Sequence, residues 1–158
     1  MKKIAILCLV MVLPLSLFAC KKDENLTKLG TSDFTIVLPE GYALTEDEFD
    51  EDQVAYYYKD DESVDFDVYQ WEKGDEYTLQ SEANTYAEAY GTTAEAVTVN
   101  GIKGYKYVSA EDYEGETYTV VNYMFEDDTY IVELCFWTIG TDEEYKAAND
   151  IISTLKKN

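Results

Sequence analysis

Carboxylates are the groups in this sequence that most directly suggest a binding chemistry. They cluster at residues 46–52, 60–67 and 126–128. Calcium takes about six to eight oxygen ligands, so loops of this kind are candidate cation sites. Four of these acids are candidate ligands: Asp50, Asp52, Asp61 and Asp65. The spacing of acids that defines an EF-hand loop is absent, so the sequence selects no specific ligand set.

Aromatic side chains on the expected strands suggest a second binding chemistry. The candidates are Tyr57, Tyr69 and Trp71. Exposed tyrosine and tryptophan rings on a sheet can hold a sugar or a partner protein. The alternative is that tyrosine is frequent here because it favours strands. The sequence leaves both interpretations open.

The residue types that are missing exclude several chemistries. The chain has no His, and all its basic residues are Lys. This excludes Ser-His-Asp and Cys-His nucleophiles, His-ligated metals and an arginine clamp on phosphate. A glycosidase-type carboxylate pair stays open, but nothing selects one pair. Cys135 lies in an apolar run and is expected to be a core residue. We therefore expect neither enzymatic activity nor a cofactor.

The charge balance excludes another class of partner. The chain has 12 Lys and 33 Asp and Glu, a net charge of −21. A surface this acidic repels phosphate backbones, which need cationic neutralisation, so we expect no nucleic acid partner. High net charge otherwise favours solubility and does not determine a fold.

The first 20 residues have the organisation of an export signal. Two lysines precede an apolar run at residues 4–13, and Leu17-Phe18-Ala19-Cys20 follows. This ending resembles the lipobox of bacterial lipoproteins. The resemblance implies that residues 1–19 are removed as a signal peptide and that a diacylglyceryl group on Cys20 anchors the protein to the extracytoplasmic face of the cell membrane. The alternative, an uncleaved membrane-spanning anchor, needs about 20 apolar residues, more than residues 4–19 offer.

The rest of the chain divides into a tether and one domain. Residues 21–31 are polar and without periodicity, so residues 20–31 are expected to form the lipidated Cys and a polar tether. Residues 32–158 are enough for a single globular domain. Asn100-Gly101 between two alternating runs predicts a tight hairpin. The segment 129–139 is apolar on both faces, which predicts a central strand.

Alternation and helical spacing predict the other elements. Strands are expected at 33–38, 42–44, 53–59, 64–68, 97–99, 102–109 and 117–125. A helix is expected between Thr78 as N-cap and Gly91, with Leu79, Ala83, Tyr86, Ala87 and Tyr90 on its buried face. A second helix begins at Thr141, buries a stripe that reaches Leu155, and has Lys156 and Lys157 at its C-terminal end. This order predicts an α+β fold, an antiparallel sheet with two packed helices.

The order of elements and three short segments resemble the PsbP-like superfamily. The segments are Phe34-Thr35-Ile36-Val37-Leu38-Pro39-Glu40-Gly41, Asn100-Gly101-Ile102 and Ile151-Ile152-Ser153-Thr154-Leu155-Lys156. The resemblance covers residues 32–157 and implies an α/β/α sandwich. The superfamily includes extrinsic photosystem proteins, a Ran-binding nuclear import factor and bacterial lipoproteins of unknown role. It implies an accessory or interaction module, here for an unknown envelope protein, and no catalytic residue. The alternative is a lipoprotein that binds Ca²⁺, a solute or a carbohydrate.

Overall fold

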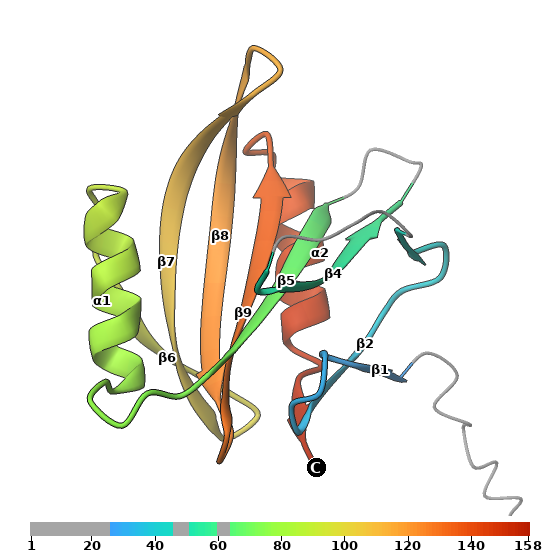
Figure 1. Ribbon diagram of the computed structural model, residues 1–158. Coiled ribbons are helices and arrows are strands. Elements are labelled where there is room, and N and C mark those ends of the chain that lie inside the picture. Colours follow the sequence, from blue (N-terminus) through green and yellow to red (C-terminus); the bar gives the residue numbers. More distant parts are fainter. Residues whose placement is uncertain (1–25, 46–50, 60–63) are drawn as a thin grey trace, which may run out of the picture.

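The computed structural model describes residues 26–45, 51–59 and 64–158, and the fold is given for these residues. They form ten strands and two helices in two antiparallel sheets (Figure 1). The predicted α+β class is confirmed. Cys20, Asp50 and Asp61 lie outside the described residues. Neither described helix is long and apolar enough to cross a membrane.

The larger sheet has seven strands among the described residues. In spatial order they are β3 (Ala43–Leu44), β4 (Gln53–Tyr58), β5 (Asp65–Glu72), β9 (Tyr130–Thr138), β8 (Glu116–Glu126), β7 (Ile102–Tyr113) and β6 (Glu95–Val99). Strand β9 lies in the middle, as its two apolar faces predict. The β6–β7 turn has φ 51° at Asn100 and 84° at Gly101, so both residues have the left-handed conformation that this tight hairpin requires.

Helix α2 (Asp142–Ile152) covers one face of this sheet. Its residues Ala148, Ile151 and Ile152 are buried in the main core, together with Leu134 and Phe136 of β9. Thr141 and Glu144 form the predicted capping box, in which each side chain bonds the other residue's backbone N–H. Leu134 and Phe136 are thus fixed in the core beneath α2. Because side chains alternate along a strand, the residues of β9 next to them must point to the opposite face of the sheet.

Helix α1 (Leu79–Ala89) packs on the opposite face, against β7 and β8 (Figure 1). It buries Leu79, Ala83 and Ala87. The predicted N-cap Thr78 is confirmed. Tyr86 and Tyr90 were expected on the buried face of this helix, but they are 38% and 48% exposed. The helix therefore covers the β7–β8 side of this face. Tyr86 lies against Trp71 of β5, and Tyr90, the C-cap residue, stacks on Tyr107 of β7.

The smaller sheet corrects the predicted boundary of the domain. It consists of β1 (Leu26–Lys28), β2 (Phe34–Val37) and β10 (Lys156–Lys157), with β2 in the middle. Residues 26–31 were expected in the tether, yet β1 pairs with β2 and Leu29 is buried in the main core. The described part of the fold thus begins at Leu26. The sequence did not predict β1, because a strand of three residues alternates over too short a stretch to be detected.

The chain's path at two places depends on pairing between segments. Residues 42–44 were expected to form a strand, and this strand, β3, pairs with β4 in the larger sheet. Lys156 and Lys157 were expected at the end of the closing helix. That helix ends at Ile152, and the two lysines extend into β10 beside β2. Pairing of distant segments decides both outcomes, and local propensity does not encode it.

Candidate functional site

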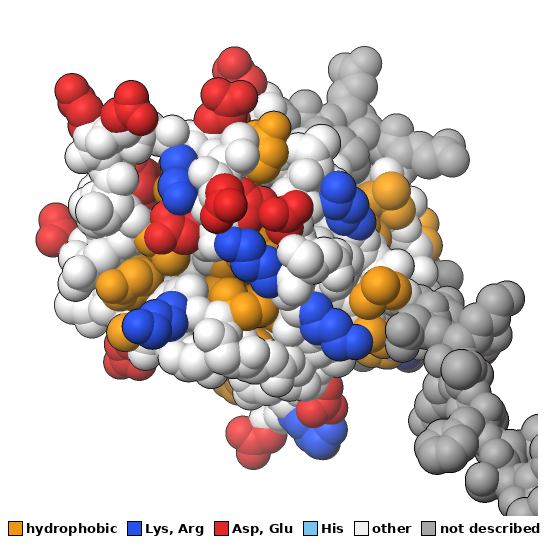
Figure 2. Space-filling view, turned by 90° about the horizontal axis from the view of Figure 1, so that it is seen from below, with side chains coloured by type: hydrophobic (Ala, Val, Ile, Leu, Met, Phe, Trp, Pro, Cys, Tyr) orange, Lys and Arg blue, Asp and Glu red, His pale blue; other side chains and the backbone are white. Residues whose placement is uncertain are grey.

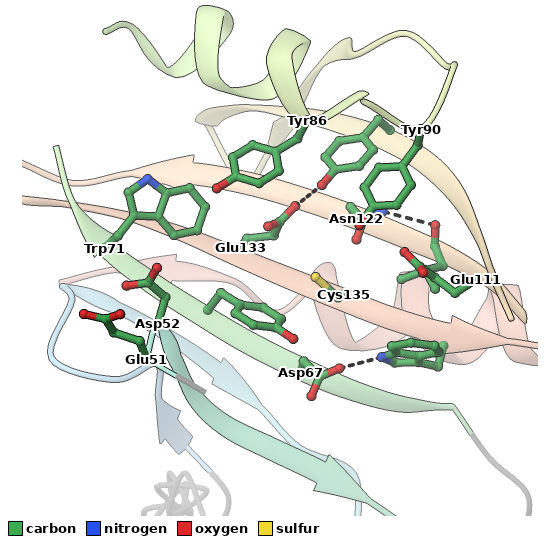
Figure 3. Close-up of a pocket in the computed structure, with 14 residues that line it drawn as sticks. Glu51, Asp52, Asp67, Trp71, Tyr86, Tyr90, Glu111, Asn122, Glu133 and Cys135 are labelled. Atoms are coloured by element: carbon green, nitrogen blue, oxygen red, sulfur yellow. Dashed lines mark hydrogen bonds between the residues drawn. The ribbon is translucent and has the colours of Figure 1, made fainter. Parts of the chain in front are cut away.

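A pocket of about 430 Å³ lies on the face of the larger sheet that α1 covers only in part (Figure 3). Strands β5 and β9 form its floor, and Tyr86 and Tyr90 project from α1 toward the sheet. Five carboxylates line it: Glu51, Asp52, Asp67, Glu111 and Glu133. Six aromatic rings line it: Tyr69, Trp71, Tyr86, Tyr90, Tyr107 and Trp137. No lysine is among the described lining residues.

The two-residue period of the strands brings these side chains together. Glu133, Cys135 and Trp137 share one face of β9, and Asp67, Tyr69 and Trp71 share the same face of β5. The register pairs Tyr69 with Glu133 and Asp67 with Cys135. The site is therefore built on two paired central strands whose other faces are fixed in the main core.

Glu133 is the most unusual group in the pocket. It is only 5% exposed, and its Oε1 accepts a hydrogen bond of 2.5 Å from the Tyr107 hydroxyl. Among the described residues this is its one hydrogen bond, and no described donor bonds Oε2. Burial raises the pKa of Glu133 to about 7, and the bond from Tyr107 offsets part of that rise. A carboxylate buried without a cation is costly when ionised.

Asp67 differs from Glu133 because both its oxygens are occupied. Gln53 Nε2 donates to Oδ1 at 2.5 Å, and Trp137 Nε1 donates to Oδ2 at 2.5 Å. Burial raises the pKa of Asp67, and these two bonds act against that rise. The Asp67 carboxylate thus orients Trp137 at one end of the pocket.

Two other polar groups of the lining, Asn122 and Tyr90, are also bonded within the protein. Asn122 Nδ2 donates to Ser109 Oγ at 3.1 Å and to the carbonyl of Val120 at 3.3 Å. Burial, and then hydrogen bonding to Glu111, raises the pKa of Tyr90 to about 12. Because Tyr107 and Trp137 donate to Glu133 and Asp67, much of the pocket's donor capacity is already used.

The predicted binding residues separate into two groups. Asp52, Tyr69 and Trp71 line the pocket. Tyr57 does not belong to an exposed binding surface, because it is 8% exposed and stacks on Phe66 with ring centroids 5.0 Å apart. Its strand position faces the main core.

The predicted cation ligands are not brought together by the described structure. Asp65 lies outside the pocket lining and accepts hydrogen bonds from the Tyr56 hydroxyl at 2.9 Å and the Lys59 N–H at 3.2 Å. In the described part of the chain, no three His, Cys, Asp or Glu side chains gather closely enough to hold a metal. A calcium site that includes Asp50 or Asp61 stays a prediction, because those residues lie outside the described ranges.

The sequence-based reasoning missed most of the pocket. Glu133 carried a signal, since it is the one acid within an otherwise apolar central strand and a buried charge needs a partner. Glu111 and Trp137 carried none, because only the register between β7, β8 and β9 brings them to this face.

Comparisons with known proteins show the fold. No protein-family profile and no curated protein matches the chain. The solution structure of cyanobacterial PsbP (CyanoP) from Synechocystis is similar, with a TM-score of 0.59 and 11% identity, over 85% of this chain and 93% of that one. A crystal structure from Bacteroides thetaiotaomicron has a TM-score of 0.60 and 17% identity over 83% of this chain. This chain spans only about half of that protein, 49% of its length.

These similarities define the class of the protein by its fold. The chain has a PsbP-like α+β fold, with helices on the two faces of an antiparallel sheet. At 11% and 17% identity, neither neighbour carries a function over to this chain.

Proposed function

We propose that this protein is a lipid-anchored extracytoplasmic lipoprotein that acts as a non-enzymatic binding or accessory module in the cell envelope. The observation that carries the proposal is the pocket on β5 and β9. Its described lining offers aromatic surface and carboxylates, but no nucleophile that a neighbouring base activates. Pockets of this size, with apolar walls and a few fixed polar groups, are the usual form of small-ligand sites.

The chemistry of the lining supports a binding role over catalysis. Burial raises the pKa of the Cys135 thiol well above its ordinary value, so it stays protonated and is a poor nucleophile. Glu133 is suited to exchange a proton near neutral pH, but the second buried carboxylate, Asp67, has both oxygens held by Gln53 and Trp137. A glycosidase-type reaction needs that second carboxylate as a base or nucleophile.

The anchor is supported by the lipobox-like segment that ends at Cys20 and by the start of the fold. Because β1 begins at Leu26, residues 21–25 separate the proposed lipid from the first strand. Five extended residues span at most about 18 Å. This short tether would therefore hold the domain closer to the bilayer than a tether that extends to residue 31.

The end of the domain at which the C-terminus lies has a mixed surface charge. Lysine side chains lie among acids on the face seen in Figure 2, the end on which the C-terminus lies in Figure 1. Lys73 and Lys157 form ion pairs there with Glu126 at 3.3 Å and Asp128 at 3.6 Å. Lysines at this end reduce the repulsion between an acidic domain and anionic headgroups.

The anchor is tested with Cys20→Ala in the host cell. We expect the unprocessed precursor to accumulate, because the modified thiol is missing, whereas Cys135→Ala should be processed normally. The readout is the mass and the membrane fraction of the product. Normal processing of Cys20→Ala would reject the lipoprotein assignment.

The accessory role is tested by crosslinking in intact cells, followed by purification and mass spectrometry. We expect one envelope protein to be recovered with the wild-type chain and lost with Cys20→Ala. If no reproducible partner is recovered, the accessory role is rejected and a free-standing binding lipoprotein remains.

A further inference from the structure

We propose that the pocket on β5 and β9 binds an elongated organic cation with two or more ammonium groups, of the class of the aliphatic polyamines. This inference rests on the proposed function, because it names the ligand class of the same pocket. Four features of the lining carry it: its charge, its remaining hydrogen-bonding capacity, its aromatic rings and the placement of its acids.

The charge of the lining is of one sign. Five carboxylates and no lysine are among the described lining residues, and the chain has no arginine or histidine. Glu133 is 5% exposed and keeps Oε2 without a donor from the described residues. A buried carboxylate of this kind needs a positive partner to be ionised at low cost, and no described side chain supplies one.

The hydrogen-bonding capacity left in the pocket favours a ligand that donates. Tyr107, Trp137 and Asn122 use their O–H and N–H groups on Glu133, Asp67 and neighbouring oxygens. Carboxylate oxygens are thus the main groups left to contact a ligand. An ammonium group has three donors and no acceptor, which matches this lining. A sugar hydroxyl also needs donors from the protein, and Tyr107, Trp137 and Asn122 have already used theirs.

Aromatic rings provide the remaining walls for a cation. Trp71 and Tyr86 lie beside Glu133, with their ring centroids 5.7 Å apart, and Tyr90 lies further along α1 (Figure 3). An ammonium group within about 6 Å of such a ring is attracted to the negative face of the ring, and methylene groups pack well on the same rings. An aliphatic chain that carries ammonium groups satisfies both contacts.

The placement of the acids indicates an elongated ligand. Glu51 and Asp52 lie at the Trp71 end of the pocket, and Glu111 lies toward the opposite end (Figure 3). The strand register agrees with this placement. Gln53, the residue after Asp52, pairs with Tyr69, whereas Val120, which lines the other end of the pocket, pairs with Trp137. From Glu133 to Trp137 the strand rises by about 13 Å. A ligand with charges at both ends can reach acids at the two ends at once.

The inference is tested by isothermal titration calorimetry of the full processed protein in detergent, with spermidine as the probe. At an ionic strength of about 0.15 M, distant surface charges are largely screened. We expect saturable binding of spermidine and none of 1,8-octanediol, a neutral aliphatic chain. The absence of saturable spermidine binding would overturn the inference.

Two pairs of variants separate the pocket from the general surface charge. Glu133→Gln should weaken spermidine binding at least about ten-fold, and Glu143→Gln, an equal loss of charge at an exposed position on α2, should leave it within about two-fold. Trp71→Ala should weaken it by about five-fold or more, and Tyr113→Ala, at an exposed ring on β7, should not. Equal effects within each pair would mean surface attraction and overturn the inference.

Failure of this inference is distinguishable from failure of the proposed function. Binding of a neutral disaccharide such as maltose, lost in Trp71→Ala, together with no spermidine binding, would reject the amine and keep the pocket as a binding site. Processing of the Cys20→Ala precursor is measured in cells and does not depend on either titration.

Discussion

The hydroxyl of Tyr107 on β7 donates a hydrogen bond of 2.5 Å to the carboxylate of Glu133 on β9, across the intervening strand β8. Both side chains are buried, and Met124 of β8 lies beneath α1 beside them. The bond stabilises a carboxylate that burial otherwise disfavours in its ionised form. It links the part of the sheet covered by α1 to the open floor of the pocket.

The raised pKa of Glu133 makes stability depend on pH. Burial raises its pKa from an ordinary value of 4.5 to about 7 in the folded protein. Between these values the unfolded chain holds fewer protons, so rising pH favours unfolding. Glu133→Gln stays neutral. Relative to wild type, this variant should gain up to roughly 3 kcal/mol of stability as the pH rises through this window, and no more above it.

Urea denaturation between about pH 4.5 and about pH 8 measures this difference. Glu143→Gln is the control, because it removes an exposed acid and should follow the wild-type curve. If the Glu133→Gln and wild-type curves run parallel across the window, Glu133 does not titrate as the burial of its carboxylate implies.

The thiol of Cys135 should resist alkylation in the folded protein. Burial, followed by the nearby Glu133 and Asp67 carboxylates, raises its pKa well above the ordinary value, so little thiolate is present. We expect iodoacetamide at about pH 8 to label Cys135 at least about a hundred-fold more slowly in the native protein than in guanidinium. Peptide mapping of the Cys135 peptide gives both rates. Similar rates in the two conditions would mean an accessible, ionisable thiol.

Local patterns were enough to predict both helices and the strands of the larger sheet, because the physical signals for them are local, but they did not predict β1 or β10. Asn100-Gly101 allows positive φ at two consecutive positions, and Thr141 with Glu144 satisfies the first N–H groups of α2. The pocket needed information that no single segment contains. Glu111 reaches it only through the register of β7 on β8, whose partners are far apart in the chain.

Single tyrosines were the hardest residues to assign from sequence. Tyr57 and Tyr69 are both on the β4–β5 hairpin, yet Tyr57 is in the main core and Tyr69 lines the pocket. The two faces of this sheet are both covered in part, so alternation along a strand does not tell which face is open. Only the position of α1 over β7 and β8 decides this.

Thr35→Val is expected to stabilise the protein. Thr35 is 4% exposed on β2, and its Oγ1 has no hydrogen-bond partner within the described ranges of the chain. Replacing an unsatisfied buried hydroxyl by a methyl group of similar shape removes a desolvation cost, so we expect a gain of about 1 kcal/mol. Thr154→Val is the matched comparison and should destabilise, because Thr154 Oγ1 accepts from the Val37 N–H at 2.8 Å. Thermal melting of both variants tests the opposite signs.

Gly104→Ala is expected to destabilise the sheet. An added Cβ on β7 would lie 2.5 Å from the carbonyl oxygen of Met124 and 2.5 Å from the ring of Phe125. The backbone oxygen cannot rotate away, so the strands must separate locally, at a cost of about 1–3 kcal/mol. In Gly74→Ala the added Cβ meets only the ring of Tyr77, at 3.3 Å, and the change should be within about 0.5 kcal/mol. Equal urea midpoints for the two variants would contradict the close approach of β7 and β8.

Asn100 connects the β6–β7 turn to the end of α2. Its Nδ2 donates to the carbonyl of Ser153 at 2.6 Å and to the carbonyl of Leu155 at 3.0 Å. Asn100→Gly keeps the backbone free to adopt φ 51° but removes both bonds, so we expect a loss of about 1–2 kcal/mol. Glu114→Gly is the matched control, because Glu114 has the same φ of 51° at the β7–β8 turn, far from α2. Glycine relieves a left-handed backbone there, so Glu114→Gly should be neutral or slightly stabilising. Chemical denaturation that gives equal effects for the two variants would mean that the Asn100 side chain contributes only its turn conformation.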